Sequence, residues 1–218
     1  MKKLTIAILM TLCSYSLVSA EIGVNVGISG NMGVFTAEAE ETMGTAGRRG
    51  SERATSVFGY GSIFLEKELG QYLRIGVDYN PEDMDSEATS HDKLCADVGS
   101  ETATCDQKAK VRFTDLTTFY AAVNVTENFF IKAGMVEVDV ITLESLGTGG
   151  TYGNTSLEGT MMGVGYNKDL TNGLFVRAEG SYTDFDDLKI NGDTGETRFI
   201  KANGIAGVAG AISIGKSF

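Results

Sequence analysis

Segments of alternating apolar and polar residues recur along this chain, and the connections between them alternate in length. In residues 22–35 apolar residues occupy nearly every second position, and the positions between them are small or polar. The same period-2 pattern returns at about 56–66, 72–80, 110–125, 129–142, 157–168, 174–185 and 197–218. This period predicts eight β-strands, each with two different faces. The connections run long, short, long, short, medium, short and medium, which predicts an antiparallel meander.

The first 20 residues have the layout of a secretory signal peptide. Lys2 and Lys3 precede an apolar stretch at residues 4–12, and small residues end the segment at Ala20. The apolar stretch is much shorter than the ~20 residues that a membrane-spanning helix needs. We therefore expect cleavage after Ala20, a mature domain of residues 21–218, and the loss of Cys13 with the signal.

The mature chain is strongly acidic. The whole sequence carries a formal net charge of −11, and removal of the two lysines with the signal peptide lowers it to −13. Such a charge excludes nucleic acid as a partner and disfavours binding to anionic lipid through a basic patch. The chain also has one proline, no tryptophan and 28 glycines, a composition that disfavours long helices.

The strand pattern also limits how the mature chain could enter a membrane. After residue 20 no apolar run is long enough for a spanning helix. A sheet can cross hydrocarbon only when it closes on itself, because every backbone polar group must then find its partner within the protein. Strands of about 10 residues, with short turns at one end and long loops at the other, are typical of bacterial barrels. The sequence thus predicts an all-β fold, an eight-stranded antiparallel up-and-down transmembrane β-barrel.

The polar faces of the predicted strands carry charges that we assign to the barrel lumen. Acidic and basic side chains can pair there across strands, which offsets the cost of burying them. The predicted lumen charges are Arg74, Asp78, Lys110, Arg112, Arg177 and Glu179. Inward glycines would leave a thin water path, at Gly23, Gly27, Gly33, Gly76, Gly159 and Gly163. Aromatic residues near the short turns predict an interfacial girdle of Phe64, Tyr72, Phe129, Phe130, Tyr166, Phe175 and Phe218.

Three predicted strands interrupt the alternation. In residues 110–125, Asp115 and Leu116 each fall on the wrong face. In 56–66 two sets of apolar residues compete for the lipid face. In 129–142 two acids share a face with apolar residues, which is tolerable only if they lie above the bilayer. The orientation of the strands at 56–66 and 129–142 stays open from sequence alone.

The chain resembles the small eight-stranded outer-membrane barrels of Gram-negative bacteria, including the opacity-type and OmpX-like proteins. The resemblance covers residues 22–218 and rests on the topology, the signal peptide and the terminal "SIGKSF". It implies that the first strand closes onto the eighth, with both termini in the periplasm and the long loops outside the cell. Ile212, Ile214 and Phe218 resemble the terminal pattern that the barrel-assembly machinery recognises, although Lys216 stands where an apolar residue is usual.

The longest predicted loop contains the two cysteines of the mature chain. Cys95 and Cys105 have nine residues between them in a chain expected to leave the cytoplasm, so we predict a disulfide. A metal site with His91 is the weaker alternative, because the spacing does not match a zinc pattern. Two loops, at residues 81–108 and 184–196, are acidic. A solvated surface explains them, and coordination of divalent cations next to lipopolysaccharide is the sharper alternative.

Three classes of function are compatible with this reading. We favour a structural or surface-interaction role through the acidic loops. A narrow passive pore for ions or small solutes is the alternative, although side chains largely fill an eight-stranded lumen. An enzyme is disfavoured, because His91 is the sole histidine and lies far from any strand end. We expect no cofactor, a monomer, and outer-membrane lipid and lipopolysaccharide as partners.

Overall fold

The computed structural model describes residues 23–43, 47–86, 89–94, 104–145, 152–192 and 198–218. The predicted signal peptide lies outside these ranges. Nearly all of the described chain is β-strand, and no helix within it is long and apolar enough to cross a bilayer.

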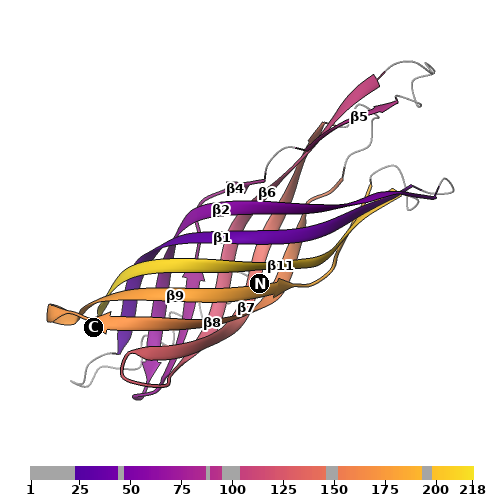
Figure 1. Cartoon of the computed structure of the whole chain (residues 1–218). Helices are drawn as coiled ribbons and strands as arrows, with labels where there is room; N and C mark the ends of the chain where they lie inside the picture. Colours follow the sequence, from indigo (N-terminus) through magenta and orange to yellow (C-terminus); the bar gives the residue numbers. More distant parts are fainter. Residues whose placement is uncertain (1–22, 44–46, 87–88, 95–103, 146–151, 193–197) are drawn as a thin grey trace.

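The strands form one antiparallel sheet that closes on itself (Figure 1). Its order is β1, β2, β3, β6, β7, β8, β9 and β11, and β11 pairs back onto β1. The short β4 and β5 continue the path of β3 along β6, and β10 pairs with β11. The elements are β1 (Val24–Met43), β2 (Gly47–Leu69), β3 (Leu73–Tyr79), β4 (Met84–Asp85), β5 (Thr89–Leu94), β6 (Thr104–Asn124), β7 (Phe129–Ser145), β8 (Thr155–Asp169), β9 (Leu174–Phe185), β10 (Leu188–Asn191) and β11 (Arg198–Ser217), with one 3₁₀ turn at Thr171–Gly173. The predicted eight-stranded up-and-down barrel is confirmed.

The barrel has two different ends. Short turns join β2 to β3, β6 to β7 and β8 to β9 at one end, which we call the short-turn end. At the other, the long-loop end, strands continue well past the predicted limits. β1 and β2 stay paired up to Met43 and Gly47, through the segment expected to be a polar loop. Figure 1 shows these extensions of β1, β2 and β11, and of β5 and β6, leaving the body of the barrel.

An exterior belt of apolar side chains surrounds the half of the barrel nearest the short turns. On β1, Val26, Ile28, Met32 and Val34 are exposed, and Ile212, Ile214 and Val208 continue the belt on β11. The two ambiguous strands now have an orientation. On β2, Val57 and Ile63 face outward, whereas Phe64 is 2% exposed and faces the lumen. On β7, Ile131 and Met135 face outward, and Glu137 and Asp139 follow on that face toward the long-loop end.

A β-bulge in β6 explains its irregular sequence pattern. Thr114 pairs with Asp139 and Thr117 with Glu137, so two residues of β6 oppose one residue of β7. Asp115 occupies the left-handed region with φ 56°, which aspartate tolerates better than most residues. The extra residue reverses the alternation. Between the bulge and the short-turn end the even-numbered residues of β6 face inward. Between the bulge and the long-loop end the odd-numbered residues face inward.

Candidate functional site

The lumen near the short turns is occupied by a network of charged side chains centred on Glu66 of β2. Both carboxylate oxygens of Glu66 accept hydrogen bonds from Arg177 of β9, from Nη1 to Oε1 and from Nη2 to Oε2, each at 2.8 Å. Glu66 and Arg177 are 1% and 4% exposed. Such a two-pronged guanidinium–carboxylate contact is strong, and burial shields it from water. It joins two strands that are not neighbours in the sheet.

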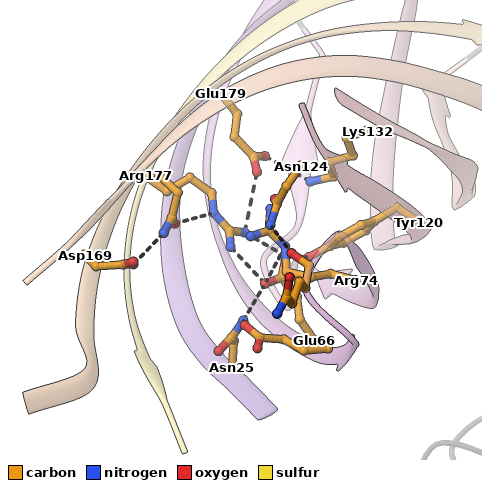
Figure 2. Close-up of polar contacts among 12 residues, drawn as sticks. Asn25, Glu66, Arg74, Tyr120, Asn124, Lys132, Asp169, Arg177 and Glu179 are labelled. Carbon is orange, nitrogen blue, oxygen red and sulfur yellow. Dashed lines mark hydrogen bonds and ion pairs between the residues drawn. The ribbon is translucent and has the colours of Figure 1, made fainter. Parts of the chain in front are cut away.

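Three further strands contribute to the same network (Figure 2). Tyr120 of β6 donates its hydroxyl hydrogen bond to Glu66 Oε1 at 2.9 Å, and Asn25 Nδ2 of β1 donates to Oε2 at 3.3 Å. Arg74 of β3 places its Nε 3.8 Å from Oε2. Glu66 is therefore surrounded by hydrogen-bond donors and cations from four other strands, which compensates the cost of burying its charge.

A second carboxylate extends the network toward the middle of the barrel. Glu179, two residues beyond Arg177 on the same face of β9, accepts a hydrogen bond from Lys132 Nζ at 2.9 Å. Its other oxygen lies 3.6 Å from Arg177 Nη1. We call the set formed by Asn25, Glu66, Arg74, Tyr120, Lys132, Arg177 and Glu179 the lumen cluster.

Aromatic rings pack around the cations of this cluster. Arg177 lies 5.1 Å from the ring centroid of Phe64, 5.1 Å from that of Phe175 and 5.3 Å from that of Phe130. Each of the three phenylalanines is 2% exposed. The rings attract the cation and exclude water from its ion pair. Together with the lumen cluster they fill the cross-section of the barrel near the short turns.

Glycines on neighbouring strands make room for these rings. A Cβ added to Gly27 would lie 2.3 Å from Phe64 Cζ, and one added to Gly215 would lie 2.3 Å from Phe175 Cζ. Each glycine is the direct cross-strand partner of the residue whose ring covers it. The same relation holds for Phe130 on Gly165, Tyr120 on Gly76 and Phe35 on Gly207. These five glycines thus lie under aromatic rings, and the expectation that inward glycines keep a water path open is wrong at Gly27 and Gly76.

The predicted lumen charges divide into two groups. Arg74, Asp78, Arg177 and Glu179 lie inside the barrel, as their positions on β3 and β9 required. Lys110 and Arg112 do not. They lie on the face of β6 opposite to Val111 and Phe113, which pack inside against Val138, Val140 and Leu157. The bulge at Asp115 is the physical reason, because it reverses the faces of every residue before it. Glu66, the centre of the cluster, was not predicted.

Lys110 and Arg112 instead form an exposed ion-pair group with Asp85 on the outside of the barrel. Asp85 accepts hydrogen bonds from Arg112 Nε at 2.7 Å and from Lys110 Nζ at 2.7 Å. Charges on the exterior face place this group beyond the apolar belt. The hydrogen bonds from Arg112 and then from Lys110 hold the pKa of Asp85 well below its usual range.

The aromatic girdle is smaller than predicted. Tyr72, Phe129, Tyr166 and Phe218 are exposed near the short turns, and the Phe129 and Tyr166 rings pack at 5.0 Å. Phe64, Phe130 and Phe175, the other predicted members, face the lumen. They share a face with the polar residues two positions away, such as Arg177 for Phe175, so the period-2 rule itself contained the correct assignment.

Among the residues that the structure describes, β2 has no backbone pairing on its β3 side over the long-loop half of the barrel. β2 and β3 pair from Leu69 with Leu73 up to Ile63 with Tyr79, and β4 then pairs with β6 alone. Pro81 accounts for the break. Asn80 donates its N–H to Leu116 on β6, so the next amide would have to point to β2, and proline has none.

Side chains cover this unpaired edge of β2. The Glu82 carboxylate accepts a hydrogen bond from the Gly61 N–H at 3.2 Å, which satisfies one edge amide. Phe58 of β2 and Phe113 of β6 meet edge to face, with ring centroids 5.6 Å apart. We call this unpaired part of the wall the opening. On β2 it lies between the outward-facing Ile63 and Val57, so it borders the apolar belt.

An apolar chamber lies directly behind the opening. It has a volume of about 60 Å³. Its walls are almost entirely aliphatic and aromatic side chains, from Phe35, Phe58, Tyr60, Met84, Phe113, Leu116, Val138, Leu157, Phe185 and Ile205. A polar cavity of about 70 Å³ lies between the chamber and the lumen cluster, and four residues, Phe35, Tyr60, Leu116 and Phe185, line both.

Several predicted residues fall outside what the structure describes. Cys95 is one of them, so its pairing with Cys105 stays a prediction. Within the described residues no group of three or more His, Cys, Asp or Glu side chains is arranged to hold a metal. Ile212, Ile214 and Phe218 face outward on β11 or just after it, and their recognition by the assembly machinery also stays a prediction.

Comparison with known proteins is informative at the level of structure. No protein-family model matches the chain, and no curated protein sequence matches it. The outer membrane protein OprG from Pseudomonas aeruginosa aligns with a TM-score of 0.55 and 11% identity, over 90% of this chain and 96% of OprG. The outer membrane protease OmpT from Escherichia coli aligns with a TM-score of 0.43 and 10% identity, over 94% of this chain and 99% of OmpT. The alignment with OprG shows that the chain shares the fold of an outer-membrane β-barrel.

Proposed function

We propose that this outer-membrane barrel admits small apolar molecules from the long-loop end and releases them sideways through its wall into the bilayer. In this proposal the long loops are extracellular and both termini are periplasmic. The observation that carries it is the unpaired edge of β2, which lies between the apolar chamber and the apolar belt.

The closed lumen supports a sideways exit. Glu66, Arg177 and the three phenylalanines are almost fully buried, so they block the path from the chamber to the short-turn end. Separation of this ion pair would leave two charges uncompensated in a low-dielectric interior, at a cost of several kcal/mol. A molecule in the chamber therefore meets a lower barrier at the wall than toward the short-turn end.

The composition of the chamber supports an apolar cargo. Transfer of apolar surface from water into this chamber is favourable by about 25 cal/mol per Å². The contact between the Phe58 and Phe113 rings closes the wall of the chamber at this point. Among the described residues no backbone hydrogen bonds pair their two strands, β2 and β6. An edge-to-face pair contributes about 0.5–1.5 kcal/mol beyond its buried area, which thermal motion can overcome.

The proposal is tested by measuring delivery of hexane to vesicles whose outer leaflet is lipopolysaccharide. Hexane is supplied from a cyclodextrin donor, and gas chromatography of the separated vesicles reports its arrival in the bilayer. We expect folded protein to accelerate delivery, and Leu157→Trp, which fills the chamber, to remove the acceleration. Met162→Trp is the matched control, because Met162 is on the same strand and 67% exposed.

A second pair of variants addresses the wall. Phe58→Cys with Phe113→Cys, in a chain whose Cys95 and Cys105 are replaced by serine, can be bridged by a short, cleavable bifunctional thiol reagent. Bridging should stop delivery, and cleavage of the bridge should restore it. Undiminished delivery through the bridged barrel would refute the sideways exit.

A surface-interaction role is the second candidate, and the exterior charge of the long-loop half favours it. Glu137, Asp139, Glu158 and Asp184 are on outward faces there, with Asp186 and Asp187 in the adjoining connection. These acids could contact lipopolysaccharide through divalent cations. Chelation with EDTA would weaken such binding, and an unchanged lipopolysaccharide affinity after chelation would contradict it.

The passive-pore alternative makes an opposite prediction about the same lumen. Because the lumen cluster fills the cross-section, we expect no discrete conductance steps from folded protein in a planar bilayer. Folding is checked beforehand by the shifted gel migration of the unboiled sample. Regular steps from the folded protein would make the pore the better proposal.

A further inference from the structure

The polar cavity beneath the apolar chamber has a chemistry of its own. Its lining contributes three carboxylate or amide groups and several hydroxyls, at Ser29, Asn31, Tyr60, Asp78, Thr118, Glu179, Ser181 and Thr183, with Lys132 as its sole cation among the described residues. A purely apolar molecule in the chamber would leave this cavity to water. A molecule that also carries a polar group could occupy both spaces, since they share four lining residues.

The cation of the cavity is already engaged. Lys132 Nζ donates to Glu179 Oε2 at 2.9 Å and lies 3.9 Å from the centroid of the Tyr120 ring. Its charge is thus compensated by a carboxylate and by the ring face. An incoming anion would have to compete with Glu179 for this ammonium group.

The acceptors of the cavity have capacity left. Glu179 Oε1 is buried and accepts no hydrogen bond within the described part of the chain, although it lies 3.6 Å from Arg177 Nη1. Asp78 accepts a hydrogen bond from the Ser62 hydroxyl. A carboxylate has about four acceptor sites, so both groups can take further donors.

We propose that the cargo is a short amphiphile whose head donates hydrogen bonds, a hydroxyl or an ammonium group, with its tail in the apolar chamber and its head at Asp78 and Glu179. This inference rests on the proposed function, because it assumes that the chamber is the cargo site. A carboxylate head is rejected, since it would face two acidic side chains across a small cavity. An alkane fills the chamber but leaves the acceptors of the cavity without a donor.

The size of the two cavities sets the length of the tail. An engineered protein cavity of about 150 Å³ holds benzene. The chamber and the polar cavity are each about half that size. A chain of about four to six carbons with one polar head is therefore the class of molecule that fits.

The test compares four probes of equal chain length in nanodiscs that contain the mature protein. These are 1-hexanol, 1-hexylamine, hexanoate and hexane, each measured by isothermal titration calorimetry and corrected for partitioning into empty nanodiscs. We expect the alcohol and the amine to bind with dissociation constants about tenfold lower than that of hexanoate, because hydrogen bonds to charged groups are worth 1.5–3 kcal/mol.

Two isosteric variants assign the effect to the cavity. Asp78→Asn and Glu179→Gln should each weaken the amine and strengthen hexanoate, so that the order of the probes narrows or reverses. Asp184→Asn is the matched control, since Asp184 is on β9 like Glu179 but faces outward. It removes the same charge and should leave the order unchanged.

The outcomes separate this inference from the proposed function. If all four probes bind in proportion to their partitioning, the chamber remains a cargo site and the head-group preference is refuted. If none of the four probes binds, and Leu157→Trp does not change the delivery of hexane, the cargo site is refuted and the inference with it. Retention of the heat-sensitive gel shift shows that each variant has folded.

Discussion

The two halves of this barrel reverse each other. Near the short turns the outside is apolar and the inside holds charges and phenylalanine rings. Toward the long loops the outside carries ion pairs such as Arg112 with Asp85, and the inside is lined by Val138, Val140, Leu157 and other apolar side chains. The first half is organised for hydrocarbon and the second for water. The comparison teaches that alternation along a strand assigns two faces, but the surroundings decide which face is apolar.

The largest expected effect comes from breaking the buried ion pair. Arg177→Ala leaves Glu66 without its main partner, and loss of one partner of a buried pair typically costs about 3–5 kcal/mol. The free energy of unfolding is measured by urea titration in lipid vesicles. Arg112→Ala is the matched variant in the other half, where the pair is exposed, and we expect its effect to be much smaller. Equal effects would mean that the two halves do not differ as described.

Truncation inside the long-loop half comes next. Leu157 is 4% exposed and packs against Val138 and Val140, so Leu157→Ala should cost about 2–5 kcal/mol by leaving a cavity. Val164→Ala, on the outward face of the same strand and 63% exposed, should cost less in the same urea titration. A larger loss of unfolding free energy for Val164→Ala would contradict a packed apolar core in the long-loop half.

The glycines that lie under aromatic rings give a smaller effect. Gly215→Ala would place a methyl group against the Phe175 ring, and overpacking of this kind typically costs about 1–3 kcal/mol. Gly210→Ala, outward on the same strand, meets nothing closer than 3.9 Å. The difference in urea midpoint between the two variants measures the role of the ring. It should shrink in a Phe175→Leu background, and persistence there would point to the backbone instead.

The smallest expected effect is the pH dependence of the exterior ion-pair group. The pKa of Asp85 is lowered by folding, so its contribution to stability is present above the unfolded pKa of about 4. It is lost as the pH falls through the folded value. Comparison of the wild type with Asp85→Asn, by urea midpoints from pH 6 downward, isolates this contribution. High salt should reduce it, because the group is exposed.

Much of the structure of the half near the short turns could be predicted from the sequence. The faces of β1, β3 and β9 match the predicted alternation, since lipid on one side and a packed lumen on the other impose a strict period of two. The same rule was available for Phe64 and Phe175. Their proximity to the short turns suggested a girdle, but the polar residues two positions away already assigned them to the lumen.

The long-loop half is harder to predict from the sequence, for two physical reasons. A bulge exchanges the inward and outward positions of a strand, and the only sign of it in the sequence was that Asp115 and Leu116 fell on the wrong faces. The break in the wall depends on how Pro81 meets the neighbouring strand, which is a property of pairing in space rather than of the local pattern. Glu66 was missed because a carboxylate next to apolar residues at a strand end also fits the start of a turn.

The bulge in β6 constrains how this protein could change over generations. Substitutions along β6 alter one side chain at a time, whereas removal of one residue at Asp115 would turn Lys110 and Arg112 inward and Val111 and Phe113 outward together. A substitution in β6 therefore changes its surroundings only locally. A single-residue deletion at the bulge would exchange the inward and outward side chains of the whole strand on its long-loop side.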